Sequence, residues 1–417
     1  MSLPLSHVRV LELSRILAGP WAGQTLADLG ARVIKVERPG TGDDTRSWGP
    51  PFAVRARENA GDAQGDAAYF LCANRGKRSI EVDFTSAEGQ QIVQKLAARS
   101  DVLIENFKVG GLVRYGLDYE SLREINPGLI YCSITGFGQS GPYRKRPGYD
   151  FLIQGMSGLM SITGEPDSSP GGKPMKVGVA VTDIFAGLYA VIAIQAALSH
   201  RSDTGEGQHI DLALLDVQAA TLANQASNYL VSGEAPGRLG NAHPNIVPYE
   251  AFNTSDGHIV LAVGNDSQFA RFCDVVEQPK LATDPRFATN PQRVRHRASL
   301  VPIIEGCLRQ RSSADWLAAL EEAGVPCGPI NDIAEFFADP QVLARQLRIE
   351  IPEGGDDPHT ARTLPGVASP MRFSQTPLRY DLPPPRLGQH TEEVLREELG
   401  MRESDFERLR AAGALGP

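Results

Sequence analysis

Histidine, cysteine and carboxylate side chains limit the chemistry that this chain can perform. None of its eight histidines lies between His7 and His200. A Ser-His-Asp or Cys-His arrangement in that half would need a histidine from elsewhere, and no G-x-S-x-G turn is present to expose a catalytic serine. The five cysteines are scattered and form no C-x-x-C pair, so neither a metal site nor a disulfide framework is expected. Carboxylates therefore remain as the candidate catalytic groups.

Nucleotide-binding motifs are absent. The first predicted strand-to-helix turn, residues 17–23, lacks the G-x-G-x-x-G spacing that brings a pyrophosphate to a helix N-terminus. Glu37 ends the next predicted strand, where an acid could bind a ribose, but such an acid is equally often a solvated strand end. Gly171 to Pro174 has neither the spacing nor the Ser/Thr of a P-loop. No nicotinamide or flavin cofactor is therefore predicted.

Basic residues gather near the ends of predicted strands. Arg38 follows the strand at 31–37, and Lys108 and Arg114 follow the strand at 101–106. Ligands of an open parallel sheet bind beyond the carboxyl ends of its strands. These side chains would then line one edge of a crevice that suits a ligand with several phosphates. Spacing alone favours the alternative that they are ordinary solvated residues.

Strand and helix patterns alternate through the first half of the chain. The strand-like segments are residues 7–13, 31–37, 78–84, 101–106, 129–135 and 208–214, and the helical ones 21–29, 88–99, 119–125 and 183–200. Repeated β-α-β units predict the fold class α/β, with an open, doubly wound parallel sheet in the large domain.

A smaller α+β domain is predicted in the second half. Gly, Pro and Asn enrich residues 233–248, which indicates a linker with a functional loop, and a helix is expected before it at 216–230. An Asp256-Gly257 turn predicts a hairpin within 251–263, and helical patterns follow. The expected divisions are a large domain at 1–215, a linker and loop at 216–248, a small domain at 249–325, and a returning stretch at 326–417 that completes the large domain.

Composition excludes several classes of protein. A length of 417 residues predicts more than one lobe, and the net charge of −9 argues against a nucleic-acid partner. The N-terminal segment has no long apolar region of the secretory type, and the most apolar stretch, Gly187 to Leu198, is too short to span a membrane. A cytoplasmic location without membrane binding is expected.

Several long segments, in one order, carry a resemblance to a known family. They are VLELSRILAGPWAGQTLADLGARVIKVERPGTGDDTR, NRGKRSIEVD, SDVLIENFKVGGLVRYGL, NPGLIYCSITGFGQSGP, VGVAVTDIFAGLYA, TGEGQHIDLAL, AGVPCGPINDIAE and PRLGQHTEEVL. Over practically its whole length the chain resembles class III CoA-transferases of the formyl-CoA-transferase (CaiB-BaiF-like) type, which are related to 2-methylacyl-CoA racemases. The order of these segments makes the resemblance far more specific than any single motif.

The resemblance implies that Asp183, in KVGVAVTDIFAG, is the catalytic nucleophile. A carboxylate can attack an acyl-CoA thioester to give an acyl-aspartyl anhydride, and the CoA thiolate can return to leave an aspartyl-CoA thioester. A place near a helix N-terminus would favour the ionised form through the helix dipole. Without the resemblance, Asp183 would be interpreted as a plain N-cap after Thr182.

One departure separates transfer from racemisation. The racemase relatives use a histidine in a Gly-His-Asp segment, and Tyr149 stands at that position here, between Gly148 and Asp150. Tyrosine is a poor general base at neutral pH, so the expected reaction is CoA transfer from an acyl-CoA, succinyl-CoA by analogy, to a dicarboxylic acid. The alternatives are a racemase-like or intramolecular CoA-moving isomerase, and a CoA-binding protein without activity. Tyr149 and Asp150 are secondary site candidates.

The resemblance also implies the binding residues and the assembly. The expected CoA contacts are Leu17, Ala18, Arg38, Val82, Thr85, Asn106, Phe107, Lys108, Arg114 and Arg146. Formyl-CoA transferase has a glycine run over its active site, whereas this chain has Gly240, Asn241, Ala242 and His243, which argues against oxalate/formate specificity. His243 could bind a substrate carboxylate or cap its own loop. The family architecture implies an interlaced homodimer.

Overall fold

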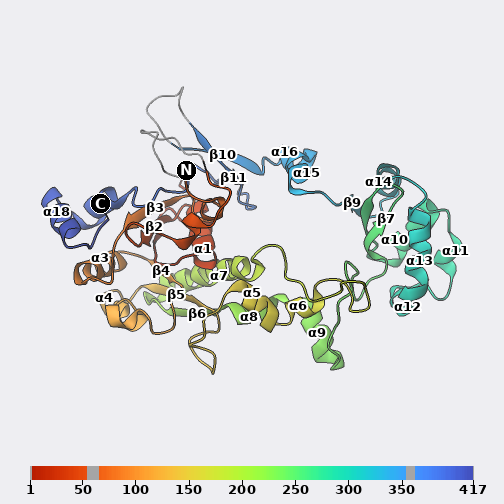
Figure 1. The fold of residues 1–417 in the computed structure, drawn as a ribbon, viewed down its shortest axis with the longest axis horizontal. Coiled ribbons are helices and arrows are strands. Elements are labelled where there is room, and N and C mark those ends of the chain that lie inside the picture. The colour runs from red at the N-terminus through yellow and green to blue at the C-terminus, as the bar shows by residue number, and fades with distance from the viewer. Residues whose placement is uncertain (1, 54–64, 354–361, 417) are drawn as a thin grey trace. The chain divides into compact units, whose positions relative to one another are not determined.

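The computed structural model describes residues 2–53, 65–353 and 362–416. The chain forms two compact units (Figure 1): residues 1–157, 178–226 and 341–417 make the first, and 158–177 and 227–340 the second. The segment 158–177 was expected in the large domain, but Gly240 donates its N–H to the Gly164 carbonyl (3.1 Å) and Arg238 donates to the Glu165 carbonyl (3.1 Å). These contacts attach it to the second unit. Residues 354–361 of the predicted returning stretch lie outside the described residues.

A parallel sheet forms the centre of the first unit and confirms the predicted fold class. Its strand order is β3-β2-β1-β4-β5-β6. The strands are β1 (Arg9–Glu12), β2 (Arg32–Glu37), β3 (Lys77–Glu81), β4 (Val102–Glu105), β5 (Ile130–Thr135) and β6 (His209–Ala213). The order reverses between β1 and β4, and ligands of open sheets bind at such a point, beyond the carboxyl ends.

Helices cover both faces of this sheet because successive strand residues point to opposite sides. Val10 and Ile104 contribute to the core beneath α1 (Ala18–Asp28) and α7 (Val181–Thr204). Leu11 and Leu103 contribute to the core on the opposite face. The helices with buried residues in that second core are α3 (Ala87–Ala97), α4 (Tyr119–Ile125), α17 (Thr391–Leu399) and α18 (Glu403–Ala411).

Close packing fixes the start of α7 against α1. A Cβ atom at Gly187 would lie 2.8 Å from the Ala18 carbonyl oxygen and 3.0 Å from the Trp21 side chain. Only glycine permits this approach, which holds the first turn of α7, with Asp183, beside the beginning of α1.

Helix α7 is longer and more apolar than expected. Within the described residues it alone is long and apolar enough, by length and composition, to cross a membrane. The prediction that this stretch is too short was wrong, because the helix continues through Thr204. Ala190 and Ile194 are buried in the sheet core, whereas Leu188 and Ile192 are exposed.

Shorter elements complete the first unit. They are η1 (Asp44–Ser47), α2 (Ala68–Leu71), η2 (Val113–Tyr115), α5 (Asp150–Met156), α8 (Leu214–Thr221), and the antiparallel pair β10 (Arg348–Pro352) and β11 (Thr363–Val367). The helix expected at 216–230 is broken into α8 and α9 (Ala223–Ser232), since Ala223 has a φ of 47°. Helix α16 (Pro340–Ala344) lies where the chain re-enters this unit.

The second unit contains a three-stranded antiparallel sheet in the order β7-β8-β9. The predicted hairpin is present as β7 (Tyr249–Asn253) and β8 (His258–Ala262), and β9 (Cys327–Pro329) adds a strand that the sequence did not predict. The helices are α6 (Leu159–Ile162), α10 (Asp266–Val275), α11 (Lys280–Thr283), α12 (Asn290–Arg295), α13 (Arg297–Leu308), α14 (Ser313–Glu322) and α15 (Ile333–Ala338). Its core includes Phe252, Phe269 and Trp316.

Candidate active site

A cavity of about 780 Å³ lies at the carboxyl ends of the central strands. Its lining includes Arg38 after β2, Val82 and Thr85 after β3, and Phe107 after β4. The structure therefore brings these expected CoA contacts together at the edge where the strand order reverses. Arg15, which the sequence analysis missed, lines the same cavity after β1.

Some other expected contacts support this cavity without lining it. Leu17 and Ala18 are buried at the start of α1. The Asn106 side chain accepts the Arg15 N–H (2.9 Å) and donates to the Arg15 carbonyl (2.7 Å). Asn106 thus ties the loop after β4 to the loop after β1.

The remaining basic candidates lie apart from the cavity lining. Lys108 lines a second cavity of about 250 Å³. The Arg114 guanidinium lies 4.5 Å from the centre of the Tyr115 ring, and that of Arg146 lies 4.6 Å from the centre of the Tyr143 ring. Arg114 and Arg146 are exposed, so cation–π contact holds them near the surface.

Buried ion pairs lie at the main cavity, whose lining includes Lys35 and Asp43. Lys35 Nζ lies 3.0 Å from Glu12 Oε1 and 3.0 Å from Asp43 Oδ2, and none of the three side chains is accessible to solvent. Burial opposes the charge of Lys35, but Glu12 and Asp43 outweigh it and raise the pKa of the ammonium group. Asp43 also accepts the backbone N–H groups of Ile16 (3.2 Å) and Thr45 (3.0 Å). The loops after β1 and β2 are therefore held by one carboxylate.

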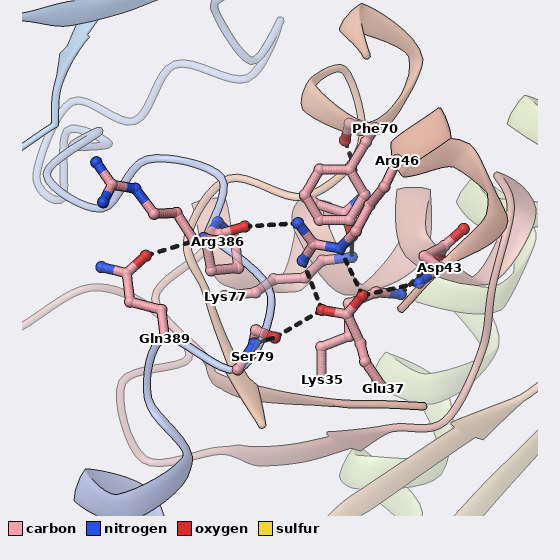
Figure 2. A network of polar contacts seen from close by, with 12 residues as sticks. Lys35, Glu37, Asp43, Arg46, Phe70, Lys77, Ser79, Arg386 and Gln389 are labelled. Atoms are coloured by element: carbon pink, nitrogen blue, oxygen red, sulfur yellow. Dashed lines mark hydrogen bonds and ion pairs between the residues drawn. The ribbon is translucent and has the colours of Figure 1, made fainter. Parts of the chain in front are cut away.

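Glu37 belongs to the same network and binds protein groups with both oxygens (Figure 2). Arg46 donates to Oε2 (2.8 Å) and Oε1 (2.6 Å), Ser79 donates to Oε1 (2.6 Å), and Asp43 N–H donates to Oε2 (2.9 Å). Burial raises the pKa of Glu37, but Arg46 outweighs burial and leaves it lowered. Glu37 is thus neither a ribose ligand nor a solvated strand end, the two alternatives that the sequence left open.

Asp183 occupies the first turn of α7. The N-cap residue is Ala180, and no side chain caps the helix, so interpreting Asp183 as an N-cap was wrong. Burial, and then the charge of Asp150, raise the pKa of Asp183 to about 7. The helix dipole was expected to favour the ionised form, but desolvation and a like charge outweigh it.

Asp150 fastens the start of α7 to its surroundings. Its Oδ1 accepts the Thr182 N–H (2.8 Å), and its Oδ2 accepts the Gln154 side chain (2.7 Å). The Thr182 hydroxyl in turn donates to Gln218 (2.7 Å) on α8. Asp150 is buried and stands beside Asp183, whereas Tyr149 is 62% exposed. The sequence analysis named Asp150 and Tyr149 as secondary candidates. In the structure Asp150 holds the start of α7, whereas the Tyr149 side chain is exposed.

Tyr69 faces the same carboxylates, and the sequence analysis missed it. Burial, and then the charges of Asp183, Cys72 and Asp150, raise the pKa of Tyr69 to about 12. The hydroxyl is therefore protonated at neutral pH and can donate a hydrogen bond. The charge of Asp43, which lines the cavity, also contributes to raising the pKa of Tyr69. No pattern in the sequence around Tyr69 indicated this.

The expected substrate loop, Gly240, Asn241, Ala242 and His243, lies in the second unit. His243 Nδ1 accepts the Asn245 N–H (3.0 Å), and the His243 carbonyl accepts from Arg297. Burial, followed by the charge of Arg297, lowers the pKa of His243. These contacts describe a neutral ring that caps its own loop, and a substrate role stays a prediction. Within the described ranges, no cluster of three or more His, Cys, Asp or Glu could hold a metal ion.

Comparison with known proteins agrees with the sequence resemblance. CoA-transferase family III matches residues 5–391. A succinate–glutarate CoA-transferase of Agrobacterium fabrum is 57% identical over 394 residues, 94% of this chain and 95% of that protein. A succinyl-CoA:glutarate CoA-transferase of Mus musculus is 45% identical over 99% of this chain and 90% of that protein. The crystal structure of a CaiB/BaiF family protein from Brucella suis, 53% identical, superposes with a TM-score of 0.81 over 95% of this chain and 100% of that chain. The predicted family and enzyme class are confirmed: the chain belongs to CoA-transferase family III and is an enzyme of that class.

Proposed function

We propose that this enzyme transfers CoA from succinyl-CoA to a dicarboxylic acid such as glutarate, with Asp183 as the covalent nucleophile. The single observation that carries the covalent role is Asp183, a carboxylate with a pKa of about 7 in the first turn of α7, where this helix packs against the beginning of α1. The substrates are proposed because similar enzymes, at 57%, 45% and 44% identity, carry succinate or succinyl-CoA and glutarate in their names. Arg15 and Arg38 supply positive charge for the phosphates of CoA.

The first half of the reaction moves CoA onto the protein. Ionised Asp183 attacks the thioester carbonyl of succinyl-CoA; a C–O bond forms, the C–S bond breaks, and the CoA thiolate leaves. The thiolate then attacks the Asp183 carbonyl of the anhydride, which releases succinate and leaves an aspartyl-CoA thioester. Protonated Tyr69 can donate a hydrogen bond to an oxygen on which negative charge develops.

The second half runs the same steps in reverse order. The acceptor carboxylate attacks the carbonyl carbon of the aspartyl thioester; a C–O bond forms, the C–S bond breaks, and the CoA thiolate leaves while a mixed anhydride of Asp183 and the acceptor is formed. The thiolate then attacks the acceptor's acyl carbon, which forms the new acyl-CoA and frees Asp183. No water is consumed, so the burial that raises the Asp183 pKa also protects the anhydrides from hydrolysis.

The test of this proposal is the identity of the product. Enzyme, succinyl-CoA and a mixture of acids (glutarate, adipate, oxalate, formate) are incubated, and new CoA thioesters are identified by mass. Glutaryl-CoA is the expected main product. The proposal fails if no dicarboxylate receives CoA. Incorporation of solvent deuterium into a 2-methylacyl-CoA without any acceptor acid would support the isomerase alternative instead.

The pH profile tests the neighbouring carboxylate. Because attack needs ionised Asp183, kcat/KM should rise with pH between roughly 6 and 8 in the unmodified enzyme. Asp150→Asn removes a charge that raises the Asp183 pKa, while its side-chain oxygen can still accept the Thr182 N–H. The rising limb should therefore move to lower pH in this variant. A limb that stays in place would show that Asp150 does not act on Asp183 electrostatically.

The homodimer belongs to the same proposal. Apolar side chains remain exposed on two neighbouring helices of the first unit, α5 and α7. They are Phe151, Leu152, Met156, Phe185, Leu188, Tyr189 and Ile192. A second chain that covers them would remove this area from water. A sedimentation mass equal to one chain at micromolar concentration would contradict the dimer. The cytoplasmic location stays a prediction.

A further inference from the structure

The loop after β4 contributes to two cavities of the first unit. Phe107 lines the main cavity, and Lys108 lines the second one, of about 250 Å³. The ring of Phe107 also meets the edge of the Phe84 ring, 5.7 Å between centres, and Phe84 lines the main cavity too. The position of this loop therefore shapes the wall of the proposed CoA site.

Glu105 lies directly behind this loop and is only 5% exposed. Its Oε2 accepts the Phe107 N–H at 2.7 Å, and the nearby Ser133 hydroxyl acts to lower its pKa. Ser133 Oγ lies 2.9 Å from Nε2 of His209, which is exposed. Polar side chains thus extend from the loop, through β4 and β5, to a surface residue of β6.

The strength of the hydrogen bond to Phe107 depends on the charge of Glu105. An ionised carboxylate only accepts hydrogen bonds, and it is a strong acceptor for the Phe107 N–H. A protonated Glu105 must donate one hydrogen bond of its own and is the weaker acceptor for Phe107. Loss of the carboxylate charge therefore weakens the bond that holds the loop.

Glu105 differs from the buried glutamates at the ends of β1 and β2. Glu12 is paired with Lys35 and Lys77, and Glu37 is paired with Arg46. Over residues 2–53, 65–353 and 362–416, Glu105 forms no ion pair. Burial accordingly raises the pKa of Glu105 to about 7, against the opposing bonds from Ser133 and Phe107.

Other titratable and charged groups face this carboxylate from each adjoining element. They are Tyr131 and Cys132 on β5, His209 on β6, Asp118, Tyr119 and Glu120 at the start of α4, and Lys108 on the loop. Burial, and then the charge of Glu105, raise the pKa of both Tyr131 and Cys132, so both stay neutral while Glu105 titrates. Tyr119 stacks on the His209 ring at 5.2 Å and limits its movement.

We propose that Glu105 is a positioning residue for CoA binding: its ionised carboxylate holds the Phe107 N–H and so fixes the loop, while Ser133 and His209 connect it to solvent. This inference rests on the proposed CoA site. Since ionised Glu105 holds the loop, affinity for CoA increases as pH rises through neutrality. Glutamine at this position keeps an oxygen that accepts the Phe107 N–H but does not titrate.

The test is the Kd for CoA, measured by calorimetry at pH 6 and pH 8 on the full-length chain. Glu105→Gln should bind CoA at pH 8 more weakly than the unmodified enzyme, because its carboxamide oxygen is an uncharged acceptor for the Phe107 N–H, and it should lose the additional weakening at acid pH that protonation of Glu105 causes. Glu105→Ala should bind about tenfold more weakly at pH 8, as expected for the loss of one hydrogen bond to a charged group, with kcat at saturating substrate little changed. Ionisation of CoA and of Asp183 is common to all forms, so differences between them report on residue 105.

Glu120→Gln serves as the matched control. Glu120 faces the same cavity, but it is exposed and is paired with Arg123 at 3.3 Å. This variant should keep the pH dependence of the unmodified enzyme. The inference is overturned if Glu105→Gln keeps that dependence too, or if folded Glu105→Ala binds CoA normally. If Glu105→Ala does not fold, Glu105→Gln decides alone. An unmodified enzyme that binds no CoA would instead overturn the proposed function.

Discussion

Replacing Asp183 by alanine should lower the rate of CoA transfer by on the order of 10⁴-fold or more, as expected for deletion of a covalent nucleophile. The buried neighbour Asp150 cannot replace it, because the Thr182 N–H and Gln154 hold that carboxylate. The Kd for CoA should change little, since the cavity lining does not include Asp183. Rates are measured with succinyl-CoA and glutarate, and binding by calorimetry.

The matched control is Asp203→Ala, which removes an exposed aspartate from the last turn of the same helix. This variant should transfer CoA at the unmodified rate. Hydroxylamine added during turnover should convert Asp183 of the unmodified enzyme into a hydroxamate, detected by peptide mass. Near-normal transfer by the Asp183→Ala variant, or a hydroxamate on another residue, would refute the covalent assignment.

The Lys35→Met variant should lose about 3–5 kcal/mol of unfolding free energy, the cost of breaking a buried ion pair. Lys35 is inaccessible to solvent, and without it Glu12 and Asp43 would retain buried negative charge with one cation fewer. Asp43 also holds the Ile16 N–H, so the loop beside the main cavity should become less ordered. Urea denaturation followed by circular dichroism measures the loss.

Lys95→Met is the control for this substitution. Lys95 is exposed in the last turn of α3, so its replacement should change the unfolding free energy by no more than about 0.5 kcal/mol. Adding Asp43→Asn to Lys35→Met should restore part of the lost stability, because it removes the buried charge that Asp43 would otherwise keep without Lys35, whereas Glu12 still pairs with Lys77. Equal stability of the Lys35 and Lys95 variants would mean that the buried network contributes nothing to folding.

Local pattern was enough to predict the central sheet. The strands of a parallel sheet are buried on both faces, so their sequences contain short apolar runs such as Val102 to Ile104, and these can be recognised without any knowledge of contacts. The regular return of helical segments then predicts crossovers and a doubly wound order, which β3-β2-β1-β4-β5-β6 confirms. Strand β9 could not be predicted this way, since Cys327–Pro329 is too short to show a period.

The candidate site could likewise be predicted only in part from the sequence. The order of segments pointed to Asp183 and to the residues after each strand, and the structure gathers Arg38, Val82, Thr85 and Phe107 around one cavity. Arg114 and Arg146 do not line that cavity, and their guanidinium groups lie over the rings of Tyr115 and Tyr143 instead. The spacing of residues in the sequence does not reveal such side-chain contacts.

The sequence by itself determined the family, the doubly wound sheet and the place of Asp183 near the start of a long helix, because these depend on residue order and local periodicity. Only the tertiary structure decided the pKa values of the side chains in the site. Burial, and then the charge of Asp150, which is distant in the sequence, raise the pKa of Asp183 to about 7. The helix dipole alone predicts a lowered pKa. Folding also encloses Glu37 with Arg46 and brings Tyr69 to the nucleophile. Desolvation and the approach of charges from distant segments arise only when the chain is packed, so no local pattern contains them.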